Sequence, residues 1–146
     1  MIPTLFSISY AGLWGQAYLD LPDFIRKAAA LGYAAVELAG KRPHLSVLDT
    51  CDDDLDALRA TAEAVGVEIA TIAAYTDFTA GASAGEVPFV EMQVRYVREL
   101  ARMGARLGAR IVRVFTGYST QVESEAADWN KCVKTVRECA GAVGEF

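Results

Sequence analysis

Four times along the chain, a short apolar run is followed by a polar loop and then by a longer segment with helical periodicity. The longer segments end near Gly32, Gly66, Gly108 and Gly144. Their spacing is close to the roughly 30 residues that one strand and its crossover helix require. Alternating strands and helices predict parallel strands joined by helical crossovers. The sequence therefore predicts an α/β protein with a four-stranded parallel sheet, which is either open or part of a barrel.

The first unit shows how each strand and helix is recognised. Large and small side chains alternate from Leu5 to Tyr10, which predicts a strand. Asp20 is a suitable N-cap for the helix that follows, and Pro22 suits its first turn. Gly32 supplies the left-handed position at which such a helix ends.

The later units follow the same pattern. We expect strands over 34–38 and 68–75 and from Arg110, and helices from the acidic segment 51–60 to Gly66, over Phe89 to Leu107, and from Ala126 or Trp129 to the last residue, Phe146. The run CDDD at 51–54 is better explained by capping and by the helix dipole than by a metal cluster.

Charge and composition exclude several classes of protein. The chain has 53% hydrophobic and 23% charged residues, which is typical of a globular protein. Its net charge of −5 disfavours sequence-independent binding to the phosphates of nucleic acid. One series of arginines has the three- to four-residue spacing that is typical of a solvated helix face: Arg95, Arg98, Arg102, Arg106 and Arg110. No segment approaches the roughly 20 apolar residues of a membrane span, and no signal peptide is recognisable, so a cytoplasmic protein is expected. The three cysteines lack CxxC spacing, which argues against a disulfide framework or a zinc site.

Three phrases of the sequence point to a barrel rather than an open sheet. No GxGxxG or GxxxxGK[ST] motif follows the first strand, where an open nucleotide-binding sheet usually carries one. The phrases LGYAAVELAG (31–40), VGVEIATIAAY (65–75) and LGARIVRVFTG (107–117) resemble the sugar phosphate isomerase/epimerase family of xylose-isomerase-like TIM barrels. The resemblance implies that residues 1–146 are a single domain, the first four βα units of an eight-stranded barrel, ending within the fourth helix.

The resemblance also implies a chemistry. Family members bind a small polyol or keto-sugar at the carboxyl ends of the strands, where barrel enzymes place their sites. They move a proton beside a carbonyl with the help of Mn, Mg, Co or Zn, as isomerases, epimerases or related dehydratases. The metal is held by carboxylates and a histidine from strands five to eight. No metal ligand or catalytic residue is therefore assigned to this chain, which we expect to be inactive alone.

Two charged residues interrupt apolar strands. An unpaired carboxylate there would be costly, so we expect Glu37 either to contact substrate or to form an ion pair, for example with Arg113. Arg113 itself either points inward, toward an anionic substrate or a catalytic carboxylate, or extends outward between helices.

The loops after the strands supply the remaining candidates. His44, the only histidine, follows the second strand and is either a substrate-side residue or an exposed loop residue, with metal ligation the least favoured role. Aromatic and hydroxyl side chains beside it suit a sugar or polyol: Tyr10, Trp14, Tyr75 and Thr116. Each of these is also compatible with simple packing or turn formation.

Two other functions remain open at this stage. A half barrel has two unpaired edges, at its first and fourth strands, so two copies could complete a barrel as a homodimer. An apurinic endonuclease shares this barrel type, but it needs a basic surface and additional histidines. The acidic charge and the single histidine disfavour it. Neither nucleic acid nor membrane is expected as a partner.

Overall fold

The computed structural model describes residues 2–80, 85–118 and 124–146. Four parallel strands form one sheet in the order β1-β2-β3-β4: β1 (Thr4–Phe6), β2 (Ala35–Ala39), β3 (Glu68–Ala73) and β4 (Ile111–Arg113). The helices are α1 (Leu21–Ala30), α2 (Asp52–Val65), α3 (Phe89–Leu107) and α4 (Glu125–Ala142). Because the strands neighbour one another in chain order, the sheet has the arrangement of a barrel half rather than of a doubly wound sheet.

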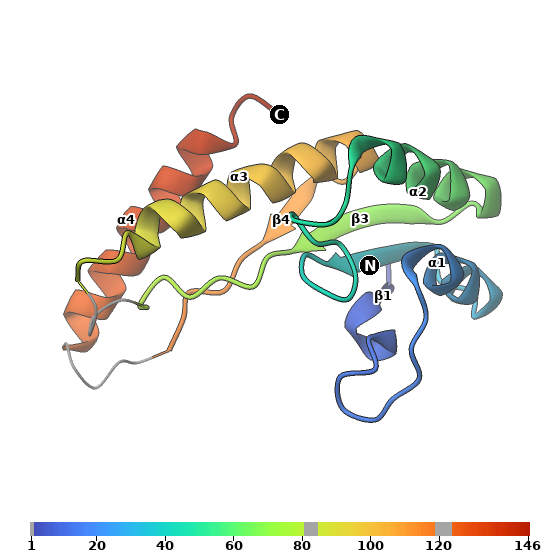
Figure 1. Cartoon of the computed structure of the whole chain (residues 1–146), viewed down its shortest axis with the longest axis horizontal. Coiled ribbons are helices and arrows are strands. Elements are labelled where there is room, and N and C mark those ends of the chain that lie inside the picture. The colour runs from blue at the N-terminus through green and yellow to red at the C-terminus, as the bar shows by residue number, and fades with distance from the viewer. Residues whose placement is uncertain (1, 81–84, 119–123) are drawn as a thin grey trace.

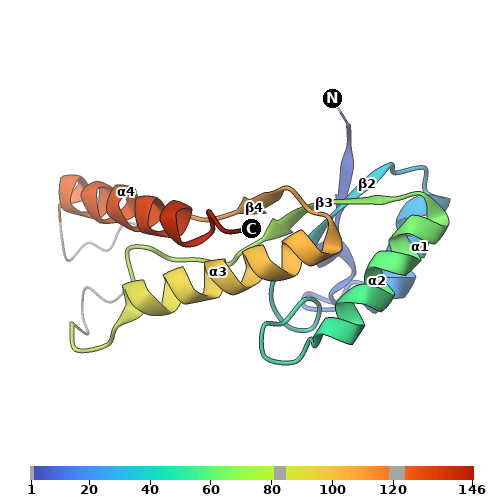
Figure 2. The ribbon, with the colours of Figure 1, turned by 90° about the horizontal axis from the view of Figure 1, so that it is seen from above.

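The helices lie in a row beside the sheet. Each helix packs against the next along the chain, and α1 to α3 cover the same face of the strands (Figures 1 and 2). Val36, Leu38 and Ile72 point into this helix layer and are completely buried there. Within the described residues, no helix is long and apolar enough to cross a membrane.

The predicted helix ends agree with the structure in three of four units. Asp20 caps α1 by accepting a hydrogen bond from the Asp23 backbone at 2.8 Å. Gly66 and Gly108 end α2 and α3 with φ angles of 71° and 82°, which L side chains rarely adopt. The acidic start of α2 is a capping box, as predicted, in which the Cys51 backbone donates to an Asp54 carboxylate oxygen at 2.9 Å.

The first strand is shorter than predicted. The strand ends at Phe6, and Ser7–Tyr10 forms a 3₁₀ helix, η1. The reason is a contact that the local pattern does not contain. The buried Ser7 hydroxyl accepts a hydrogen bond at 2.9 Å from the backbone N–H of Ala39, at the end of β2.

The last helix also differs from its prediction. It begins at Glu125, because the Ser124 hydroxyl accepts a hydrogen bond from the Ala127 backbone and acts as N-cap. The helix ends at Ala142 with Val143 as its C-cap, so it does not continue to Phe146 as the sequence predicted, and Gly144 lies just beyond its end.

The arginine series on α3 is not simply a solvated face. Arg102 and Arg106 reach α2, where they pair with Asp52 and Asp56 at 2.6–3.2 Å. These side chains are 35% to 56% exposed, so water screens each pair and its contribution to stability is small. Their role is to align the two helices.

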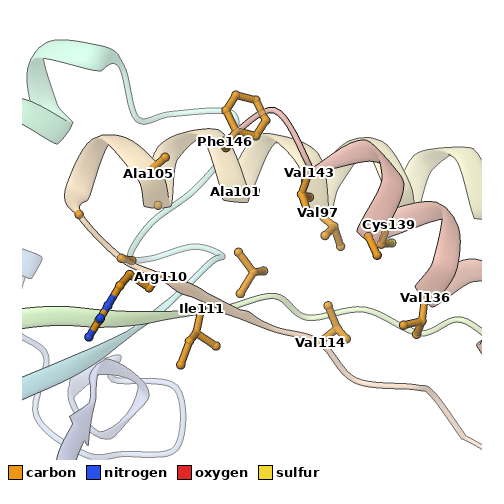
Figure 3. A pocket seen from close by; sticks show the side chains of 15 residues that line it. Val97, Ala101, Ala105, Arg110, Ile111, Val114, Val136, Cys139, Val143 and Phe146 are labelled. Atoms are coloured by element: carbon orange, nitrogen blue, oxygen red, sulfur yellow. The ribbon is translucent and has the colours of Figure 1, made fainter.

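An apolar cavity of about 630 Å³ lies in the helix layer, between α3, β4 and α4 (Figure 3). Val97, Val114, Val136 and Cys139 surround it. Its lining carries a single charged side chain, Arg110, which pairs with Glu68 at 3.4 Å. The other polar group among these residues is the Cys139 thiol, whose pKa is raised by burial.

Candidate functional site at the carboxyl ends of the strands

The candidate site lies on the sheet face opposite the helices. Successive side chains of a strand point to opposite faces. Val36 and Leu38 face the helix layer, so Glu37 between them faces the other side. Val112 and Val114 pack against the hydrophobic core on the helix side, which places Arg113 between them on the same face as Glu37.

Glu37 and Arg113 form an ion pair across this face. The Arg113 Nε donates to Glu37 Oε1 at 2.6 Å, from β4 to β2. The intervening strand β3 carries the small residues Thr71 and Ala73 there, which leave room for the arginine. The ion pair allowed by the sequence is present, and Arg113 points inward rather than outward between helices. Whether either residue also contacts substrate stays a prediction.

Two aromatic rings enclose the arginine. Its guanidinium carbon lies 4.6 Å from the ring centre of Phe115 and 5.2 Å from that of Phe6. Phe6 belongs to β1, and in a flat sheet β1 and β4 would be about 14 Å apart, three strand spacings. Arg113, on the edge strand β4, thus contacts Phe6 of the opposite edge strand β1 as well as Glu37 of β2, as expected for a concave face.

A second cation lies at the same end of the strands. The Lys41 ammonium, just after β2, is 4.0 Å from the ring centre of Tyr75, just after β3. The Tyr75 ring lies 5.9 Å from that of Phe115. Burial raises the pKa of the Tyr75 phenol, against the opposing effect of the nearby Arg113. We call Lys41, Tyr75, Phe115 and Arg113 the cation–aromatic rim.

The rim is positioned by a tyrosine from α3. The Tyr96 hydroxyl donates to the Gly40 carbonyl at 2.6 Å and accepts from the Tyr75 backbone N–H at 3.2 Å. It therefore ties the residue before Lys41 to the backbone of Tyr75. Burial raises the pKa of the Tyr96 phenol. Gly40 must be glycine here, because a Cβ would lie 2.9 Å from the Ala73 carbonyl.

Beyond the rim, the loops after β3 and β4 are held together. The Thr76 hydroxyl donates to the Phe115 carbonyl at 2.6 Å and accepts from the Phe115 N–H at 2.9 Å. The Thr79 hydroxyl accepts from the Tyr118 N–H at 3.1 Å. Between them, Gly117 has a φ of +115°, and a Cβ there would lie 2.3 Å from an Asp77 carboxylate oxygen. The loops continue the β3–β4 pairing through side chains.

His44 is buried, which excludes the exposed loop residue that the sequence left open. Its Nε2 lies 3.1 Å from the Leu19 carbonyl, and its Nδ1 lies 3.1 Å from the Ser7 hydroxyl. Since a carbonyl only accepts, Nε2 carries the proton in the neutral ring. Burial lowers the pKa of His44. The histidine therefore joins the β2 loop to η1 and to the segment before α1.

Three other predicted binding residues lie apart from the Glu37–Arg113 pair. Tyr10 packs against Phe24 of α1, with ring centres 6.1 Å apart. Trp14 is 74% exposed in the loop after η1, and Thr116 is exposed beyond β4. The structure thus brings together three of the seven predicted binding residues, namely Glu37, Tyr75 and Arg113. Sequence reasoning missed Lys41, whose only signal is its place directly after the second strand.

The described residues contain no group of three or more His, Cys, Asp or Glu side chains that could hold a metal ion. The two ring nitrogens of His44 are both engaged by protein groups. The divalent metal that the resemblance implies therefore does not fit the part of the chain that the structure describes.

Comparison with known proteins identifies this architecture. A family model described as xylose isomerase-like TIM barrel matches residues 25–145. No curated protein sequence matches the chain. Among solved structures, D-psicose 3-epimerase with D-tagatose, from Clostridium cellulolyticum H10, superimposes with a TM-score of 0.76 at 19% identity, over 98% of this chain and 48% of that one.

Two further structures have the same fold. A probable 3-DHS dehydratase from Bacillus anthracis gives a TM-score of 0.67 at 18% identity, over 99% of this chain and 49% of that one. A xylose isomerase domain containing protein from Salmonella typhimurium LT2 gives 0.66 at 22% identity, over 96% and 46%. The chain spans about half the length of the structures that it matches.

Proposed function

The chain belongs to the xylose isomerase-like TIM barrel family, and from that premise we propose that the whole protein is an isomerase, epimerase or related dehydratase of a small polyol or keto-sugar. The proposed reaction moves a proton between carbons next to a carbonyl, through an enediolate. The structural neighbours include an epimerase crystallised with a ketohexose and a probable dehydratase, which supports this reaction class.

The observation that carries the proposal is the Glu37–Arg113 pair on the concave face. Barrel enzymes bind substrate at the carboxyl ends of their strands; Arg113 is the last residue of β4, and it pairs with Glu37 in the middle of β2. A carboxylate accepts hydrogen bonds from sugar hydroxyls and a guanidinium donates them. The rings of Phe6, Phe115 and Tyr75 offer apolar surface to the carbon skeleton. In this proposal the pair binds and orients the substrate and does not transfer its proton.

A divalent metal would polarise the substrate carbonyl in such a reaction. Because the described residues offer no set of metal ligands, we assign no metal-binding role to them. The residues of this chain supply binding surface on one side of the barrel mouth.

The test is sugar conversion by the protein expressed from its complete coding sequence. We expect it to interconvert ketohexoses such as D-fructose, D-psicose or D-tagatose when divalent metal salts are present. The chain 1–146 alone should give no turnover.

Arg113→Met should raise the KM of the whole protein by about tenfold or more, because it removes one charged hydrogen bond to the substrate. The matched variant Arg59→Met, on α2, should behave as wild type. Metal-dependent turnover by residues 1–146 alone, or no conversion of any of these sugars or of 3-DHS by the whole protein, would contradict the proposal.

A second candidate function is self-association into a complete barrel. The strand order leaves β1 and β4 at the edges of the sheet, and exposed edges recruit further strands. On β4 and just beyond it, Ile111 and Phe115 are 56% and 44% exposed. If two copies pair through these edges, light scattering of residues 1–146 will give twice the chain mass of 15.7 kDa. A monomer at all concentrations excludes this candidate.

A further inference from the structure

The pairing between β2 and β3 changes at the carboxyl ends of the two strands. The Gly40 N–H donates to the Ala73 carbonyl at 2.9 Å, as in a regular parallel ladder. In such a ladder the next bond would run from the Tyr75 N–H to the Gly40 carbonyl. The Tyr96 hydroxyl lies between these two groups, since it accepts from the Tyr75 N–H and donates to the Gly40 carbonyl. A side chain of α3 therefore takes the place of one backbone hydrogen bond.

The same replacement occurs on the other side of Tyr75, between β3 and β4. The Ala74 N–H donates to the Arg113 carbonyl at 2.8 Å, so the next regular bond would run from the Phe115 N–H to the Ala74 carbonyl. The Thr76 hydroxyl takes its place, because it accepts from the Phe115 N–H at 2.9 Å and donates to the Phe115 carbonyl at 2.6 Å. Tyr75 thus stands where side-chain hydroxyls take over the pairing of β3 with both of its neighbours.

Both hydroxyls are held by the packing around them. Tyr96 is half-buried on α3, and burial raises the pKa of its phenol, so the hydroxyl keeps the proton that it donates. Thr76 is buried, with 5% of its surface exposed. A water molecule in either place would also satisfy the backbone groups. It would leave the strand ends free to shift, whereas a hydroxyl carried by a packed side chain has one position.

The contacts of the Tyr75 ring depend on this arrangement. The ring meets the Lys41 ammonium at 4.0 Å and the ring of Phe115, whose centre is 5.9 Å away. Lys41 directly follows the residue that Tyr96 binds. Phe115 is itself the residue that Thr76 binds. A binding group whose surroundings hold it in one place loses less conformational freedom when its ligand arrives.

We propose that Tyr96 and Thr76 are positioning residues of the substrate site, whose hydroxyls set the spacing of the strand ends and hold the Tyr75 ring where it meets substrate. The inference rests on the proposed function, in which Tyr75 offers apolar surface to the carbon skeleton. Both hydroxyls are engaged by backbone groups and act through Tyr75. The loss of either hydroxyl should therefore weaken substrate binding without slowing the chemical step.

The first test is the kinetics of the whole protein on D-fructose, D-psicose and D-tagatose. Tyr96→Phe removes only the hydroxyl and keeps the ring in the helix layer. We expect its KM to rise about threefold or more while kcat stays within about twofold, which is the pattern of lost substrate binding. In a Tyr75→Leu background the same change should raise KM no further, because the ring through which it acts is absent. The control Tyr33→Phe, just before β2 at the amino end of the sheet, should behave as wild type.

Thr76 supplies a pair of variants for the other side of Tyr75. Thr76→Val keeps the size of the side chain but leaves the Phe115 N–H without its acceptor, so KM should rise as it does in Tyr96→Phe. Thr76→Ser restores the hydroxyl and should recover the affinity that Thr76→Val loses. This pair decides the question if Tyr96→Phe does not fold.

The second test needs no turnover and uses NMR of residues 1–146. The ring of Tyr75 should shift the side-chain signals of Lys41 upfield and give nuclear Overhauser effects to the ring of Phe115. We expect both effects to be weaker in Tyr96→Phe than in wild type, because the Tyr75 backbone has lost its hydroxyl partner. In Tyr33→Phe both effects should be unchanged.

An unchanged KM in Tyr96→Phe, or an equal rise in the Tyr75→Leu background, would overturn the inference and leave the hydroxyl with the sole role of satisfying backbone groups. If the whole wild-type protein shows no turnover, the proposed function fails, and the NMR comparison alone decides whether Tyr96 fixes the Tyr75 ring. Unchanged Lys41 shifts and ring contacts in Tyr96→Phe would overturn the positioning role in either case.

Discussion

The Glu37–Arg113 pair allows the balance between stability and function to be measured. Glu37→Leu leaves Arg113 unpaired, but its side chain is 34% exposed and can reach water, so we expect a loss of about 1–2 kcal/mol of unfolding free energy. Arg113→Met leaves Glu37 unpaired at 17% exposure, and the loss should be larger, about 2–4 kcal/mol.

The double variant should be nearly as stable as wild type. Two apolar side chains of similar size replace the pair and leave no charge without a partner, so we expect a difference within about 1 kcal/mol. The coupling energy of the cycle, which is the sum of the two single losses minus the loss in the double variant, is then about 3–6 kcal/mol. This combination would mean that folding does not need the pair, whose proposed role is in substrate binding.

The assay is urea unfolding of the wild type and the three variants at neutral pH. An exposed pair serves as the control, because Arg59 and Glu63 on α2 are 53% and 64% exposed and lie one helical turn apart. The cycle of Arg59→Met and Glu63→Leu should give a coupling below about 0.5 kcal/mol. A Glu37–Arg113 coupling no larger than this control value would refute the half-buried geometry from which the magnitudes were derived.

Three further predictions concern the residues around the site. Because burial lowers the pKa of His44, the unfolded chain binds a proton that the folded chain does not, so the unfolding free energy should fall as the pH drops from about 8 to about 5.5. In urea titrations, His44→Gln should flatten this pH dependence of the unfolding free energy. An unchanged pH dependence in the variant would argue against a buried neutral ring. Gly117→Ala should lower the free energy of chemical unfolding by about 2 kcal/mol or more, because of the φ of +115° and the clash of the new Cβ with Asp77. The control Gly85→Ala, whose Cβ would meet nothing within 4 Å, should be nearly neutral. Equal effects of the two variants would count against the loop contact. Tyr96→Phe should lower the unfolding free energy from thermal unfolding by about 1–2 kcal/mol and should speed the hydrogen exchange of the Tyr75 amide. An unaltered exchange rate would mean that the Tyr96 hydroxyl does not hold the Tyr75 backbone.

The repeating units could be predicted from the sequence because the features that define them are local. Asp20, Gly66 and Gly108 each act on the turn in which they stand, through capping or a left-handed backbone. The pairing of Glu37 with Arg113 could also be predicted from the sequence, because both residues interrupt apolar strands that the repeating units make parallel.

The features that the sequence did not reveal depend on contacts between distant segments. The first strand ends early because Ser7 bonds to the end of β2, 32 residues away. His44 is buried because the loop after β2 packs against η1 and the Leu19 carbonyl. Lys41 becomes part of the rim only when the ends of β2 and β3 lie side by side. No local pattern encodes these contacts.

The central claim is that the sheet curves, so that the inward Arg113 of edge strand β4 meets the side chain of Phe6 on the opposite edge strand, β1. The direct measurement is the set of nuclear Overhauser effects from the Arg113 side chain in residues 1–146. We predict contacts to the ring of Phe115 and also to that of Phe6, which belongs to β1 at the opposite edge. Contacts to Phe115 without any to Phe6 would mean that Arg113 does not reach across the concave face, and would contradict both the half barrel described for this chain and the site built on it.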